Sequence, residues 1–131
     1  MILLAVDPGN FKCGLAVVNQ EAGVLTKMIT PLENFRETVN NLHRDYRFTV
    51  VVVGDRTNSK AIRDMLAFLK LPVVTVDENR SSVEGRYRYL KDNTKGLARF
   101  IPVGLRVPKK PYDDYVAVIL AERFLKTGPL P

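Results

Sequence analysis

The feature that most constrains this fold is the point where the spacing of apolar residues changes along the chain. Three short apolar runs come first, and only turn-forming residues separate them, at positions 7–9 and 21–23. Short apolar runs joined by such turns are typical of an antiparallel meander. The sequence therefore predicts three strands, over residues 2–6, 13–18 and 24–29.

From residue 32 onward, segments with helical spacing alternate with short apolar runs. Apolar residues at positions 35, 39, 42 and 46 lie three or four apart, which predicts a helix with one apolar face. We expect, in order, a helix over 35–46, a strand over 49–53, a helix from 58 or 59, a strand over 72–76, a helix over 81–92, a loop over 93–111 and a helix over 112–127. Asn58 or Ser59 is expected to cap the second helix, and the segment from Ser81 to Glu84 has the form of a capping box.

Strands that alternate with helices imply parallel pairing through crossover helices. The chain has 131 residues and shows neither an internal repeat nor a linker, so we expect one domain over 1–131. The expected fold is α/β: a five-stranded mixed sheet, with three antiparallel strands followed by parallel strands, and helices on both faces.

The sequence also predicts where the protein acts. No apolar run is long enough to span a bilayer, and the first residues have no basic segment of the kind that begins a signal peptide. Cys13, the one cysteine, has no partner for an internal disulfide and is expected to be buried. We therefore expect a cytoplasmic protein with no membrane partner.

The positive charge is concentrated in one segment. The chain carries a net charge of +6, yet residues 80–110 alone hold nine Lys or Arg against two carboxylates, a local +7. A basic segment beside a nearly neutral body favours a polyanionic partner such as nucleic acid, although a merely solvated basic surface would give the same composition.

Carboxylates recur where the predicted strands end. Asp7 ends the first strand, Asp55 follows the fourth, and Asp77 and Glu78 follow the fifth. If these three strands are parallel, their acidic residues lie along the edge of the sheet where open α/β folds bind ligands. Two further carboxylates, Asp113 and Asp114, open the last predicted helix and could be brought to the same edge.

Such a cluster of carboxylates is costly unless a cation neutralises it. Oxygen ligands suit Mg²⁺ or Mn²⁺, and a carboxylate-held metal pair can activate water and stabilise the leaving oxygen of a phosphodiester. The only histidine, His43, falls in a predicted helix, and we expect it to have a packing or surface role. Each acidic residue also has a structural explanation, as a turn residue, a strand terminator or a helix cap.

Four segments of the chain match motifs of one known family. The segment Ala5–Asn10 with Gly14–Val17 resembles the opening strand, turn and second strand of the YqgF/RuvX family, which belongs to the ribonuclease H-like superfamily, and Val51–Gly54 resembles its fourth strand. The segment Asp77–Glu84 resembles its D-E-R-x-[ST]-T-x-E motif, and Asp113–Leu125 resembles its final helix. Departures occur at three places: the loop Asp55-Arg56-Thr57-Asn58, the position of Lys12, and Arg80 in place of an apolar residue.

The resemblance implies a ribonuclease H-like fold and a metal-dependent nuclease. Members of the family have been assigned to maturation of the 5′ end of 16S ribosomal RNA, and have also been named as Holliday junction resolvases. The acidic triad of the family carries over onto Asp7, Glu78 and Asp113, with Asp114 as the reserve catalytic ligand. Asp55 and Asp77 are expected to act around these ligands.

The expected partner is RNA or branched DNA. The residues expected to contact it are Lys12, Arg80, Arg86, Lys109 and Lys110. Tyr87 and Tyr89 are expected either to stack on bases or to pack within the protein. A resolvase would be a homodimer, since a four-way junction has twofold symmetry, whereas processing of ribosomal RNA requires no dimer.

Two other hypotheses compete with the nuclease. One is a nucleic-acid-binding module of the same fold without catalysis, which the basic segment serves equally well. The other is an actin-like phosphotransferase, because the segment from Asp7 to Asn10 also resembles the phosphate loop of that fold. Such enzymes bind nucleotide between two domains of this type. A chain of 131 residues supplies only one such domain, which argues against this hypothesis.

Overall fold

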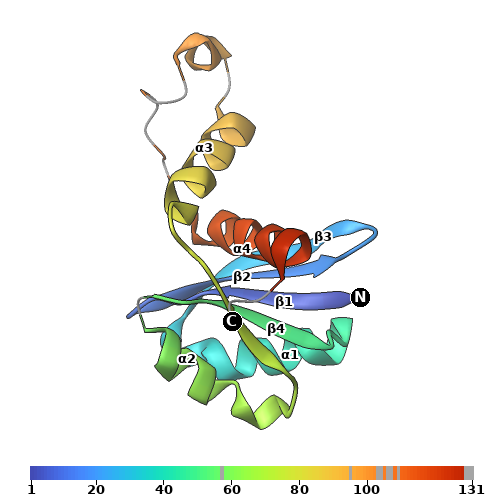
Figure 1. Cartoon of the computed structure of the whole chain (residues 1–131). Coiled ribbons are helices and arrows are strands. Elements are labelled where there is room, and N and C mark those ends of the chain that lie inside the picture. Colours follow the sequence, from blue (N-terminus) through green and yellow to red (C-terminus); the bar gives the residue numbers. More distant parts are fainter. Residues whose placement is uncertain (57, 95, 103–104, 106–107, 109, 129–131) are drawn as a thin grey trace.

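A computed structural model describes residues 1–56, 58–94, 96–102, 105, 108 and 110–128 (Figure 1). The strands are β1 (Ile2–Asp7), β2 (Lys12–Asn19), β3 (Gly23–Pro31), β4 (Val50–Gly54) and β5 (Val73–Val76). The helices are α1 (Phe35–Tyr46), α2 (Ser59–Met65), α3 (Ser81–Asn93) and α4 (Asp113–Thr127). The described residues also form the short 3₁₀ helices η1 (Leu32–Asn34), η2 (Ala67–Leu69) and η3 (Gly96–Phe100), the last of them within the segment expected to be a loop.

The five strands form one sheet in the order β3-β2-β1-β4-β5. Strands β1, β2 and β3 pair antiparallel, whereas β4 pairs parallel with both β1 and β5. The predicted mixed sheet of an α/β fold is therefore confirmed. Because β1, β4 and β5 run in one direction, their carboxyl ends lie at the same end of the sheet.

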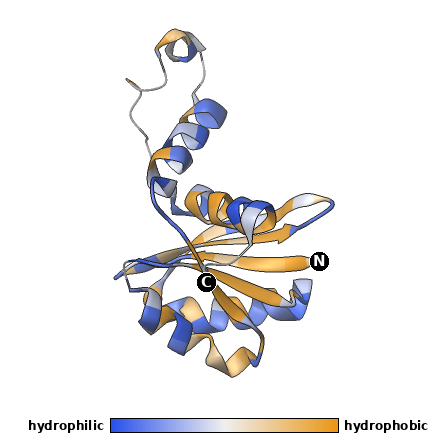
Figure 2. Cartoon of the chain, in the orientation of Figure 1, coloured by the Kyte–Doolittle hydropathy of each residue, from blue (hydrophilic) through white to orange (hydrophobic). Residues whose placement is uncertain are grey.

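Each face of the sheet packs against a different set of helices (Figure 1). Along β1, Leu4 and Val6 belong to the core shared with α1 and α2, and Leu3 and Ala5 belong to the core shared with α4. This alternation is the two-residue period of a strand buried on both sides. Figure 2 shows the strands as the most hydrophobic part of the ribbon. No helix in the described part of the chain is long and apolar enough to cross a membrane.

Helix α3 covers α4 and projects away from the sheet (Figure 1). Gly85 lies where the two helices cross, and a Cβ there would come within 2.7 Å of Val116 Cγ2. Helices thus lie on both sides of the sheet, as predicted, but the third predicted helix packs on another helix and not on the sheet.

The predicted N-cap position of α2 is confirmed, but neither α2 nor α3 has the predicted side-chain cap. Asn58 holds the N-cap position of α2 with left-handed backbone (φ 58°), but its side-chain amide donates to the carbonyl of Gly9 at 2.9 Å and does not cap the helix. At α3 the N-cap position belongs to Arg80 (φ 63°), and the hydroxyl of Ser81 donates to the carbonyl of Glu78 at 2.7 Å. Both side chains instead fasten the loops at the carboxyl end of the sheet.

Candidate active site

Asp7 lies at the carboxyl end of β1, the central strand of the sheet. The pKa of its carboxyl group is raised to about 7, chiefly by burial and in smaller part by the negative charges of Asp113 and Glu78. These charges act on Asp7 because the fold brings both carboxylates close to it, although one follows β5 and the other begins α4. The fold therefore brings Asp113 and Glu78 within electrostatic range of Asp7 at this end of the sheet.

Glu78 is held beside Asp7 by the end of β4. Its backbone N–H donates to Asp55 Oδ1 at 3.1 Å, and its carboxylate lies directly over Gly54, where a Cβ would overlap Glu78 Oε2. This oxygen is buried and accepts no hydrogen bond from the described residues. Burial raises the pKa of Glu78, a hydrogen bond from the backbone of Arg56 opposes the rise, and the charge of Asp55 adds to it.

Asp113 reaches the site because α4 begins directly above β2. The carbonyl of Asp113 lies over Gly14, which pairs with Asp7 across the β1–β2 ladder, and a Cβ on Gly14 would overlap it. The Asp113 carboxylate is 3.4 Å from Lys12 Nζ. Any residue other than glycine at position 14 would therefore push α4, and Asp113 with it, away from the sheet.

Asp114 points toward a different strand. Its Oδ2 lies 3.5 Å from Nζ of Lys27 on β3, and its Oδ1 accepts the backbone N–H of Tyr115 at 3.0 Å. Helix phase therefore separates the two neighbouring aspartates, and only Asp113 influences the charge on Asp7.

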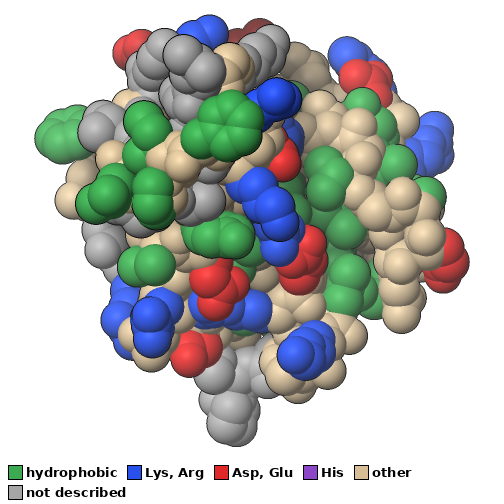
Figure 3. All heavy atoms as spheres, turned by 90° about the horizontal axis from the view of Figure 1, so that it is seen from above, with side chains coloured by type: hydrophobic (Ala, Val, Ile, Leu, Met, Phe, Trp, Pro, Cys, Tyr) green, Lys and Arg blue, Asp and Glu red, His purple; other side chains and the backbone are tan. Residues whose placement is uncertain are grey.

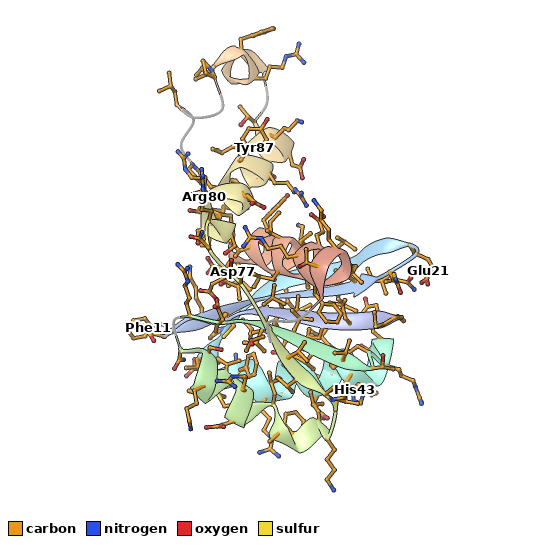
Figure 4. All side chains as sticks on the ribbon, in the orientation of Figure 1. Phe11, Glu21, His43, Asp77, Arg80 and Tyr87 are labelled. Carbon is orange, nitrogen blue, oxygen red and sulfur yellow. The ribbon has the colours of Figure 1, made fainter. Side chains whose placement is uncertain are left out.

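Asp55 and Asp77 lie around the triad. Asp55 fixes the backbone of Glu78, as described above. Asp77 is exposed, with its Oδ1 accepting the N–H of Asn79 at 2.9 Å and lying 4.0 Å from Arg56. In Figure 4, Phe11, Asp77 and Arg80 are labelled on the left of the view and Glu21 and His43 on the right.

The donors at this site suit a hard divalent cation, because they are carboxylate oxygens and one of them, Glu78 Oε2, is buried with no hydrogen-bond partner among the residues that the structure describes. Even so, no three His, Cys, Asp or Glu side chains of the described residues are arranged as a ready-made metal-binding group. The ion pair between Lys12 and Asp113 offers a physical reason, since it places an ammonium group on one of the three carboxylates.

The residues expected to bind nucleic acid are spread over several elements. Arg80 is exposed at the start of α3, and Lys110 is exposed before α4. Arg86 is partly buried and engaged in contacts of its own. Lys109 lies outside the described residues. Lys12 is half exposed beside Asp113.

Two ion pairs join the basic segment to α4, one through a basic residue of the segment and one through its carboxylate Glu84. Arg88 pairs with Glu122 at 2.7 Å, and Arg123 pairs with Glu84 at 2.9 Å. Figure 3, which views the molecule from above, shows Lys and Arg side chains interspersed with Asp and Glu on this face. The local +7 of the sequence is therefore not a uniformly positive surface.

The two tyrosines of α3 have different environments. Tyr89 is buried, and its ring meets that of Tyr115 edge-on with centroids 5.5 Å apart, so it packs between α3 and α4. Tyr87 is exposed, with Lys91 Nζ 5.9 Å from its ring centroid. His43 lies against Phe48 with ring centroids 4.7 Å apart, and Cys13 is buried as expected.

Two glycines position the triad, although the sequence indicated them only as members of longer motifs and gave them no role of their own. Gly14 makes room for the backbone of Asp113, and Gly54 makes room for the carboxylate of Glu78. An isolated glycine inside or at the end of a strand often marks a close approach by another group, and this signal could have identified both.

The fold is ribonuclease H-like. No protein-family model and no curated protein matches the sequence. Among solved structures, the chain is similar to Thermus thermophilus RuvC in complex with a Holliday junction substrate, with 16% identity, 99% of this chain and 100% of that chain covered, and a TM-score of 0.63. It is also similar to Fowlpox virus resolvase in complex with Holliday junction DNA, with 17% identity, 97% and 98% coverage, and a TM-score of 0.65.

Proposed function

We propose that this protein is a divalent-metal-dependent nuclease that hydrolyses phosphodiesters in structured nucleic acid. The observation that best supports the proposal is that the charges of Glu78 and Asp113 act on buried Asp7 at the carboxyl end of the parallel strands. The likeness in fold, over almost the whole chain, to two proteins solved with Holliday junction DNA supports nucleic acid as the partner.

In this proposal Asp7, Glu78 and Asp113 hold Mg²⁺ or Mn²⁺. A divalent ion bound there supplies positive charge that lowers the pKa of an attacking water and stabilises charge on the phosphate. Asp7 and Glu78 are the anchoring ligands, because their burial raises the free energy of the ionised carboxylates until a cation binds. Asp113 would hold the ion with them once its carboxylate left Lys12, and the ammonium group of Lys12 would then be available to a phosphate oxygen.

Two neighbouring side chains act as positioning residues. Asp55 holds the backbone of Glu78 through its carboxylate, and Asn58 holds the turn after Asp7 through the carbonyl of Gly9. Both come from the loop after β4, whose sequence departs from that of the YqgF/RuvX family. The departure therefore lies in residues that support the site rather than in the acidic triad.

Two substrates are proposed. The resemblance to YqgF/RuvX proteins favours the 5′ end of pre-16S ribosomal RNA, and the likeness to resolvases bound to junctions favours branched DNA. Arg80, Arg86, Lys109 and Lys110 are proposed to contact phosphates in either case. A homodimer is proposed only for the junction substrate, whose symmetry requires two cuts.

A binding module without catalysis is the second candidate. It is favoured by the ion pairs of the two carboxylates at the start of α4, each of which already has a lysine partner. In such a module the lysines would neutralise the acidic end permanently, and nucleic acid would bind through the basic residues alone.

One experiment separates these candidates. Purified protein is incubated with pre-16S ribosomal RNA and with a four-way DNA junction, each with Mg²⁺, with Mn²⁺ and with chelator. The nuclease requires cleavage of at least one substrate that stops in chelator. Binding without cleavage under every metal would support the module, and absence of both would refute a role in nucleic-acid metabolism.

A further inference from the structure

The turn between β1 and β2 displays the most exposed large apolar side chain of the described residues. Phe11 keeps 87% of its surface accessible to solvent. Isolated exposed apolar residues are common on protein surfaces, so exposure alone indicates no function. The backbone beneath this side chain and its place in the fold supply the further evidence.

The backbone of this turn is fastened on both sides of the ring. The carbonyl of Phe11 accepts the N–H of Leu32 at 2.9 Å, and the carbonyl of Gly9 accepts the side-chain amide of Asn58 at 2.9 Å. A Cβ on Gly9 would also overlap the carbonyl of Lys12, so the turn is tightly closed. The ring is therefore held out by a fixed support, and a ligand that stacks on it would need to order little more than the ring itself.

The ring lies at the end of the sheet that carries the acidic triad. Figure 4 shows Phe11 projecting from that end, on the side of Asp77 and opposite to Glu21. Phe11 follows Asp7 by four positions, so even a fully extended chain keeps the two Cα atoms within about 14 Å. That distance corresponds to about four base steps of 3.4 Å along one strand. The next residue, Lys12, contacts Asp113 directly.

We propose that Phe11 is a stacking platform for one unpaired nucleobase, lying within about four nucleotides of the phosphate held at the acidic triad. This inference rests on the proposed nuclease function and adds to it what the substrate must offer. Every base has a π-face, so aromatic stacking tolerates sequence, but bases inside a continuous duplex have no free face. Phe11 therefore selects branch points and duplex ends, where a base can leave the stack.

The test uses a synthetic four-way DNA junction carrying a fluorescent adenine analogue within about four nucleotides of the branch. Binding is measured in chelator and with Ca²⁺ for the wild type, Phe11→Ala, Phe11→Leu and Phe11→Trp. Val24→Ala is the matched control, because Val24 is an exposed apolar residue at the start of β3, beside the hairpin that carries Glu21. Thermal unfolding of each variant is recorded, and an exposed side chain predicts little change.

Phe11→Ala and Phe11→Leu should weaken binding by about 5- to 150-fold, the range measured for loss of one stacked base. Phe11→Trp should keep both the affinity for the junction and the change in fluorescence of the adenine analogue on binding. Val24→Ala should behave as the wild type. A covalently closed circular duplex, which has neither a branch point nor an end, should bind all variants alike.

Three results would overturn the inference. Equal junction binding by Phe11→Ala and the wild type would remove the platform while leaving the nuclease proposal intact. Retained affinity in Phe11→Leu would indicate a plain apolar contact, and a change of oligomeric state in Phe11→Ala would assign the ring to a second copy of the chain. A wild type that binds no nucleic acid at all would instead refute the proposed function, and this inference with it.

Discussion

Replacing Asp7 with Asn should change how the stability of the protein depends on pH. The folded protein raises the pKa of this carboxyl group from 3.8 to about 7, with burial as the largest cause and the charges of Asp113 and Glu78 adding to it. Between these two pKa values the folded state binds more protons than the unfolded state. The free energy of unfolding therefore falls as pH rises through this window and levels off above about pH 7.

The shift sets the size of the effect. One pKa unit corresponds to about 1.4 kcal/mol, so ionised Asp7 lowers the free energy of unfolding by about 4 kcal/mol above pH 7. About 3 kcal/mol of this loss occurs between pH 5 and pH 8. Burial also raises the pKa of Glu78, which adds a smaller loss of the same sign. Asp7→Asn removes the larger contribution, because the amide stays neutral at every pH.

Urea unfolding in chelator at about pH 5 and about pH 8 measures the difference. The wild type should lose stability between the two conditions, and Asp7→Asn should lose much less and be the more stable protein at about pH 8. Asp64→Asn is the control, since its carboxylate lies on the surface of α2 with Lys60 and contributes little. Parallel losses in the wild type and Asp7→Asn would refute the claim that Asp7 carries an unfavourable buried charge.

Three further predictions concern residues around the site. Gly54→Ala should displace the carboxylate of Glu78 and lower single-turnover cleavage by about 100-fold or more, since a displacement of about 1 Å at a reacting group has that effect. Lys12→Ala should tighten Mn²⁺ binding a few-fold in titration calorimetry, because it removes the ammonium group that competes with the metal for Asp113. An unchanged affinity would mean that this ion pair does not affect metal binding. Replacing both Lys109 and Lys110 with Ala should reduce the log–log salt slope of binding by about 0.7 to 0.9 for each lost phosphate contact, and an unchanged slope would show that neither touches nucleic acid.

The mixed sheet could be predicted because its antiparallel and parallel parts have different sequence patterns. Turn residues join the first three apolar runs, and helical spacing appears only after residue 32, which is enough to predict an antiparallel meander followed by parallel strands. The location of Asp7 and Glu78 at one end followed from strand direction alone, because parallel strands place their carboxyl ends together.

The details of the site depended on tertiary contacts that no local pattern encodes. The choice between Asp113 and Asp114 is made by the rotation of α4 over β2 and β3, where Lys12 and Lys27 each take one carboxylate. The capping predictions failed for a similar reason: the Asn58 side chain finds a better partner in the carbonyl of Gly9, far away in sequence, than in its own helix.

Metal-dependent cleavage by the wild type and Asp7→Asn tests the central claim most directly. Both proteins are mixed in excess with a labelled four-way DNA junction and with pre-16S ribosomal RNA, and cleavage is followed in a single turnover with Mn²⁺. The wild type should cut one of these substrates, and Asp7→Asn, which keeps the shape of the side chain but not the charge that a metal requires, should bind that substrate and leave it intact. Cleavage by Asp7→Asn at the wild-type rate would contradict the assignment of the acidic end of the sheet as the active site.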